Sequence, residues 1–335
     1  MTSAPADPGC AAQGAQAARC GAAAEPLAGT APAATAGWLL IEHPGPWPAY
    51  GHPPGLPAPL AQAADRLLAH GVRPQLIRRT DRRGRRGPRG PAVFLAGGDG
   101  ARCWIERIEP EELTGRHIAG LLGSAAFRAP RAPGLGRPGG PLLLVCTHGR
   151  REVCCARYGR PVALALAARF GPAVWETTHV GGDRFAANLV LLPQGAYFGR
   201  LDPAGALRVA GRALAGELDL TAYRGTAGRT EAQQCAEWHL RRALPEARIG
   251  ALRPLPPRPG DGAYRHRFAR GAERYEVLVE PCTGPVPGPP SCAEGTAAAP
   301  GGHRLVRIAA NRRGPAVRAA ELAPTASSGG FRTPG

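Results

Sequence analysis

The stretch PLLLVCTHGRREVCCARYGRPVALALAARFGPAVWETTHVGGD, residues 141–183, decides the fold of this chain. It opens with a short apolar run, 141–145, which is typical of a buried strand. The Ala/Leu-rich segment 161–171 follows and predicts a helix, and the apolar run 173–177 predicts a second strand. If the connection is right-handed, the loops after the two strands lie at the same edge of a sheet.

Both of these loops carry residue types that bind metals. The first, CTHGRREVCC, spans 146–155, and the second, HVGGDRFAAN, spans 179–188. Thiolate and imidazole are ligands for soft and borderline metals such as iron, copper and zinc. The sequence therefore favours a metal or redox site at this edge of the sheet.

The next part of the chain completes a recognisable order of elements. The apolar runs 188–193 and 196–201 predict a β-hairpin. One helix is then expected to begin at Thr230, with Gln233 three residues on as a capping-box partner. Strand, helix, strand, hairpin and helix is the order of a thioredoxin-like domain.

On these residues the chain resembles the sucrase/ferredoxin-like proteins, whose members carry a thioredoxin-like ferredoxin domain. The resemblance is close in 146–163, 175–201 and 223–225 and looser in 37–48, and it spans most of 37–243. It implies an electron carrier with a [2Fe–2S] cluster that has two Cys ligands on one iron and two nitrogen ligands on the other. The chain lacks the paired carboxylates of glycoside hydrolysis, so sucrase activity is not expected.

Residue by residue, the resemblance implies that Cys146 and Cys155 are the two thiolate ligands and that His179 is the first nitrogen ligand. At the fourth position this chain has Asp183, where some members have a second His. A carboxylate is a harder ligand than imidazole, but it can bind iron. His148, in the first loop, is an alternative nitrogen ligand. We expect Cys146, Cys155, His179 and Asp183 to hold the cofactor.

Two other functions remain open at this point. The same four residues would suit a structural zinc site about as well. A thiol oxidoreductase could use Cys154 or Cys155, although the chain lacks the Cys-x-x-Cys arrangement that lowers a thiol pKa. Further along the chain, Cys282 and Cys292 could form a second small site or a disulfide. We expect an electron carrier more than an enzyme acting alone.

The N-terminal part of the chain has a similar order of predicted strands and helices. Its predicted elements are, in order, a strand at 37–43, a helix at 56–71, strands at 73–77, 91–97 and 102–108, and a helix after Pro110. The Arg-rich segment 78–90 is predicted as the solvated tip of a hairpin between two of these strands. We expect a smaller α/β lobe that is a degenerate thioredoxin-like repeat without the ligands.

The chain of 335 residues is long enough for two domains. The predicted organisation is a disordered tail at 1–36, the N-terminal α/β lobe at 37–130, the thioredoxin-like ferredoxin domain at 139–244, a β-rich extension at 245–320 and a disordered tail at 321–335. In the extension, the strand candidates are 264–269, 274–280 and 303–309.

The composition indicates which cellular compartment and which kind of partner to expect. No apolar run approaches the length of about 18 residues that a membrane helix needs, and no signal peptide is evident, so a cytoplasmic protein without membrane contact is expected. In such a reducing compartment, nine cysteines favour metal or thiol chemistry. The net charge of +17 comes from Arg alone, since the chain contains no Lys. No nucleic-acid motif accompanies it, so nucleic-acid binding is not expected. The resemblance to an electron carrier implies a redox partner protein of unknown identity.

Overall fold

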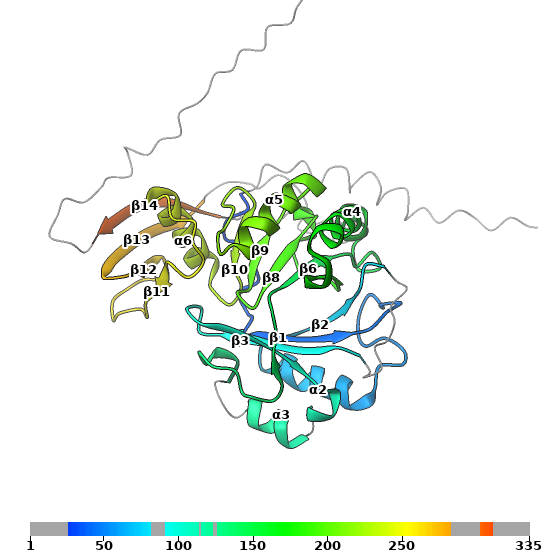
Figure 1. The fold of residues 1–335 in the computed structure, drawn as a ribbon. Coiled ribbons are helices and arrows are strands. Elements are labelled where there is room, and N and C mark those ends of the chain that lie inside the picture. The colour runs from blue at the N-terminus through cyan, green and yellow to red at the C-terminus, as the bar shows by residue number, and fades with distance from the viewer. Residues whose placement is uncertain (1–25, 82–90, 114, 123–125, 283–301, 311–335) are drawn as a thin grey trace, which may run out of the picture.

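The computed structural model describes residues 26–81, 91–113, 115–122, 126–282 and 302–310. They form an α/β fold with one ten-stranded mixed sheet flanked by helices and a second, four-stranded antiparallel sheet (Figure 1). No helix among these residues is long and apolar enough to cross a membrane.

The first half of the large sheet comes from the N-terminal part of the chain. Its elements are β1 (Gly37–Glu42), α2 (Ala58–Ala69), β2 (Val72–Arg78), β3 (Val93–Gly98), β4 (Cys103–Ile108), the 3-10 helix η1 (Pro110–Glu112), α3 (Gly115–Leu122), the 3-10 helix η2 (Ala126–Arg128) and the edge strand β5 (Arg137–Pro138).

The second half follows directly. Its elements are β6 (Leu142–Cys146), α4 (Val153–Phe170), η3 (Gly171–Ala173), β7 (Val174–Thr177), η4 (Asp183–Phe185), β8 (Leu189–Leu192), β9 (Ala196–Phe198), α5 (Pro203–Leu214), β10 (Tyr223–Thr226) and α6 (Glu231–Ala243).

The two halves share one topology. The strand order is β10-β9-β8-β6-β7-β2-β1-β3-β4-β5. In each half a parallel pair joined by a helix (β1–α2–β2 and β6–α4–β7) is followed by two antiparallel strands (β3–β4 and β8–β9). The halves meet where β2 pairs antiparallel with β7. This is the topology that the predicted repeat requires.

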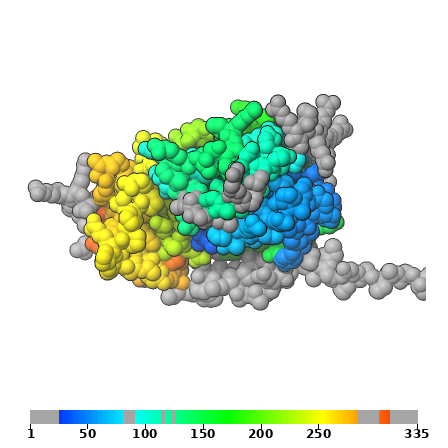
Figure 2. Space-filling view, turned by 90° about the horizontal axis from the view of Figure 1, so that it is seen from below, coloured from blue at the N-terminus to red at the C-terminus, as the bar shows by residue number. Residues whose placement is uncertain are grey.

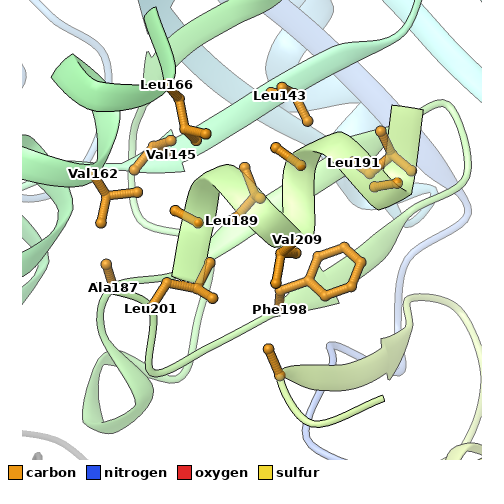
Figure 3. Packing of buried hydrophobic residues seen from close by; sticks show 14 of the residues in the cluster. Leu143, Val145, Val162, Leu166, Ala187, Leu189, Leu191, Phe198, Leu201 and Val209 are labelled. Atoms are coloured by element: carbon orange, nitrogen blue, oxygen red, sulfur yellow. The ribbon is translucent and has the colours of Figure 1, made fainter. Parts of the chain in front are cut away.

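Successive side chains of a strand point to opposite faces of the sheet, so the buried ones lie in one inner core and two outer cores. The helices α4 and α5 cover the outer face of the second half, over the core drawn in Figure 3. The helices α2 and α3 cover the outer face of the first half (Figure 1). The inner core receives side chains from both half-sheets and includes Leu40, Phe94, Leu144, Cys146, Cys155, Trp175 and Tyr197. Cys146, at the end of β6, is therefore on the inner face.

The smaller sheet follows α6 and packs against it. Its strands, in sheet order, are β11 (Arg253–Pro254), β12 (Arg265–Arg270), β13 (Glu273–Pro281) and β14 (His303–Ala310). These include the three strands predicted for this region. On the face seen in Figure 2, this part of the chain lies beside the N-terminal half.

The predicted hairpin around the Arg-rich segment is wrong. The strands β2 and β3 do not pair, because β1 lies between them, parallel to β2 and antiparallel to β3. Local proximity in the chain favours a hairpin, but α2 returns the chain to form a parallel pair instead. Of the Arg-rich segment, 82–90 lies outside the described residues.

Two helices also differ from the prediction. The helix α4 begins at Val153 and passes through Pro161, where the sequence predicted its start. Proline is favoured in the first turn of a helix, but here the buried face of α4 outweighs the one backbone bond that Pro161 removes. The helix α5 and the strand β10 lie between the hairpin and the helix predicted at Thr230, and neither was predicted.

Candidate metal centre

Three of the four predicted ligands lie together. Cys146 ends β6, Cys155 lies in the first turn of α4, and His179 follows β7. Their ligand atoms all lie within 4.8 Å of one another, and the Cys155 Sγ is 3.7 Å from the His179 Nδ1. Both cysteines are 1% exposed, whereas His179 is half-buried. This group could hold a metal ion.

The backbone brings these residues together in two ways. In the parallel pairing of β6 and β7, Cys146 lies opposite Thr177, so the two loops leave the sheet side by side. The helix α4 approaches the end of β6 closely at Gly159, where an added Cβ would lie 2.0 Å from the Cys146 carbonyl oxygen. Only glycine fits this approach, which places the first turn of α4 over the site.

The two thiols differ in acidity because they share a hydrogen bond. Donation from Cys155 lowers the pKa of Cys146 well below its usual range, and the nearby His179 ring acts in the same direction against the effect of burial. The Cys146 and Cys154 sulfurs, together with burial, raise the pKa of Cys155. A metal that binds both sulfurs as thiolates would displace the proton that Cys155 donates.

Asp183, the fourth predicted ligand, is not part of this group. It is buried at the start of η4, directly after Gly182 in the left-handed conformation. Its backbone carbonyl accepts a hydrogen bond from Cys154 Sγ at 3.5 Å. The two-glycine turn thus keeps Asp183 next to the site, but its carboxylate does not lie with the three ligand atoms.

His148, the alternative nitrogen ligand, uses both ring nitrogens within the protein. Its Nε2 lies 2.8 Å from the Pro48 carbonyl oxygen, and its Nδ1 accepts from the His179 backbone N–H at 3.3 Å. Burial lowers its pKa, so the ring is neutral at neutral pH. This histidine ties the first ligand loop to the N-terminal half, where Trp47 also packs edge-on against it.

The remaining cysteines lie outside the group. Cys154 is buried beside Tyr158 and Ala186, and its side chain therefore has different neighbours from that of Cys155. Cys103, Cys235 and Cys282 are free thiols elsewhere, and no disulfide joins any two described cysteines. Cys292, with which Cys282 was predicted to form a second site or a disulfide, lies outside the described residues.

Arg224 is a buried residue beside the site that sequence reasoning did not single out. Its guanidinium is 1% exposed and donates to the Gly181 carbonyl at 3.0 Å and to Asn188 Oδ1 at 2.7 Å. Asn188 in turn donates to the Gly182 carbonyl at 2.8 Å. Burial lowers the pKa of Arg224 to about 10, which still leaves it charged at neutral pH. The only sequence signal was its place in YRG, one of the segments that carry the resemblance.

A second buried charge connects the site to the junction between the halves. Glu176 in β7 is fully buried and pairs with Arg78 of β2 at 2.7 Å and with Arg160 of α4 at 2.9 Å. It also accepts a hydrogen bond from the Thr147 hydroxyl at 2.9 Å. Thr147 directly follows Cys146, so this network holds the first ligand loop against both halves.

Fold and site together define an α/β protein with a candidate Cys₂His metal centre between two topologically equivalent half-sheets. A family model described as sucrase/ferredoxin-like matches residues 92–224, and this match confirms the resemblance to that family. The matched range includes all three grouped ligands. Neither the curated proteins nor the solved structures contain a match to this chain.

Proposed function

We propose that this protein transfers electrons through a [2Fe–2S] cluster held by the grouped residues Cys146, Cys155 and His179, with Asp183, which lies next to this group, as the fourth ligand. The observation that carries the proposal is the buried group of two thiols and one imidazole within 4.8 Å, inside the segment that matches the family. When bound, the cluster supplies reversible one-electron chemistry.

The surroundings of the group suit a redox centre. Imidazole ligation removes negative charge compared with four thiolates and raises the potential of a cluster above about −400 mV. The buried positive charge of Arg224 and the N-terminal end of α4 both favour an anionic group at this place. Because His179 is half-buried, it is the ligand through which a partner could approach.

Anaerobic purification with iron and sulfide analysis tests the proposal. We expect a reddish-brown protein with visible absorption and equal amounts of iron and acid-labile sulfide. A colourless protein that contains neither, after anaerobic purification from iron-supplemented cells, would overturn it.

A structural zinc site is the second candidate, and one distance favours it. In tetrahedral zinc sites the bond lengths place a thiolate sulfur and an imidazole nitrogen about 3.6 Å apart. The Cys155 Sγ and His179 Nδ1 are separated by 3.7 Å, as one metal ion requires. Stoichiometric zinc in a colourless protein would identify this function.

A thiol oxidoreductase is the weaker alternative. A reactive thiol needs access to solvent and a lowered pKa. Cys154 and Cys155 are both buried, and the pKa of Cys155 is raised. We further propose that the electron donor and acceptor are redox proteins and that the protein works in the cytoplasm. The number of cysteines supports this location, because thiols stay reduced there.

A further inference from the structure

A cleft of about 480 Å³ lies between the N-terminal half and the candidate metal centre, and His179 forms part of its wall. Its volume is within the range of about 300–1,000 Å³ that is typical of small-molecule sites. We propose that this cleft binds a small aromatic anion, with the carboxylate or phosphate at Arg73 and Arg151 and the ring against Tyr50. This inference goes beyond the proposed function, because such binding does not need the metal.

Arg73 and Arg151 each form a hydrogen bond with one of two linked histidines, His179 and His148. Arg73 Nη2 donates to the His179 carbonyl oxygen at 3.1 Å, and the His179 N–H donates to His148 Nδ1. The backbone N–H of Arg151 donates to the His148 carbonyl oxygen at 3.2 Å. All four residues line the cleft, and the hydrogen bond to the His179 carbonyl oxygen holds the Arg73 guanidinium in its wall.

The charge of the cleft is unbalanced. Neither Arg73 nor Arg151 forms an ion pair with any residue that the structure describes. Among the described lining residues the one acidic side chain is Asp65, which already pairs with His52 at 2.9 Å. Two unneutralised guanidinium groups in one concave site favour an anion, and Arg matches the planar, bidentate geometry of carboxylate and phosphate.

The wall beside these charges is apolar and exposed. Tyr50 is 76% exposed, and the Arg151 guanidinium lies 4.0 Å from the centre of its ring. Leu68, which is 57% exposed, and Leu56 also line the cleft. A phosphate or carboxylate alone would leave this surface uncovered, whereas a flat ring next to the anionic group would cover it.

The proposal is tested by calorimetric titration of the metal-free protein with phenyl phosphate, with inorganic phosphate and phenol as comparison ligands. We expect phenyl phosphate to bind more tightly than either, and its binding to weaken with added NaCl. Arg73→Gln and Arg151→Gln should each weaken binding about tenfold, the effect expected for the loss of one charged hydrogen bond.

Two further variants separate the proposal from general effects. Arg169→Gln is the control, because Arg169, like Arg151, lies over an aromatic ring, that of Phe170, but is exposed outside the cleft. It should not change the affinity. Tyr50→Ala should weaken phenyl phosphate but not inorganic phosphate.

Other results would overturn the proposal. An absence of saturable binding at millimolar phenyl phosphate, or unchanged binding in folded Arg151→Gln protein, would show that the cleft is no anion site. Equal affinities for phenyl phosphate and inorganic phosphate would contradict the aromatic part. Circular dichroism of each variant checks the fold. Because the titration uses metal-free protein, its outcome is independent of the iron analysis that tests the proposed function.

Discussion

Cys154 and Cys155 are neighbours in the chain but have different surroundings. Cys155 lies in the inner core with Cys146, whereas Cys154 packs beside Tyr158 and Ala186. We therefore expect Cys155→Ser to abolish the visible absorption of the purified protein and Cys154→Ser to leave most of it. Absorption spectra and iron content measure both effects. The reverse result would show that the ligand is Cys154.

The role of Asp183 can be tested through the potential of the cluster. If its carboxylate binds iron, Asp183→His replaces an anionic ligand by a neutral one, and the midpoint potential should rise, as it does from all-Cys to His-ligated clusters. Redox titration monitored by visible absorption measures the change. An Asp183→Ala protein with unchanged spectrum and potential would show instead that the carboxylate is not a ligand.

Arg224 both positions the second ligand loop and contributes a buried positive charge. Arg224→Gln removes the charge and should lower the midpoint potential, since the oxidised, less negative cluster gains relative stability. It should also reduce the free energy of unfolding by about 1.5–3 kcal/mol, because charged hydrogen bonds are lost. Arg224→Lys keeps the positive charge but lacks the planar guanidinium group. Its midpoint potential should therefore change little, whereas its free energy of unfolding should fall. Equal midpoint potentials in the unmodified protein, Arg224→Gln and Arg224→Lys would show that the role of Arg224 is structural alone.

At the scale of elements, most strands follow from short apolar runs, because each run has to be buried on at least one face. The strands β6, β7 and β8 were predicted to within one residue of their observed bounds, whereas β9 begins at the predicted residue and ends three residues early. The helix α5 was missed although Asp202 accepts from the Gly205 N–H as its N-cap and Pro203 occupies its first turn, both of which are sequence signals of a helix start. The pairing of β2 with β1 and β7 depends on the tertiary fold, which local patterns do not contain.

The same limit applies to the candidate metal centre. The motif positions of Cys146, Cys155 and His179 could be predicted, because the resemblance fixes them residue by residue. The hydrogen bonds that occupy His148 depend on Pro48, which is distant in the chain. Arg224 has no periodic pattern around it, so its role becomes evident from burial and hydrogen bonds alone.

The helix α6 and the small sheet partly bury three histidines, which should make this unit sensitive to acid. Burial lowers the pKa of His239, His266 and His303. At pH above the normal value of about 6.5, both states are neutral and the full stability is present. As the pH falls from there through the lowered pKa values, the unfolded state takes up protons first and stability is lost.

Urea unfolding between pH 7.5 and 5 measures this loss. The His239 Nε2 contacts the His303 carbonyl oxygen at 3.2 Å, and a glutamine can provide a donor there. We therefore expect His239→Gln to flatten the pH dependence of the free energy of unfolding. An unchanged slope would assign the acid sensitivity to other groups.

At the scale of the whole molecule, the two half-sheets join through a short seam. The strands β2 and β7 pair through two residue pairs, Ile77 with Thr177 and Arg78 with Glu176. The candidate metal centre and the proposed anion cleft both lie near this seam, since His179 follows β7 and Arg73 belongs to β2. The relative position of the two halves should therefore determine the geometry of both sites.

Glu176 is the residue that tests this dependence. Its carboxylate is fully buried between Arg78 and Arg160, so Glu176→Gln leaves two arginines without their counter-charge. Removal of one partner from a buried ion pair costs about 3–5 kcal/mol, and we expect a loss of this size in the free energy of unfolding from urea titrations. The matched control is Glu217→Gln, which breaks the exposed pair with Arg212 and should cost less than about 1 kcal/mol.

Because the Thr147 hydroxyl also donates to Glu176, the Glu176→Gln protein should bind less iron than the Glu217→Gln control. Equal losses in the two variants, with equal iron contents, would show that the seam is held mainly by apolar packing and that the first ligand loop does not depend on this network.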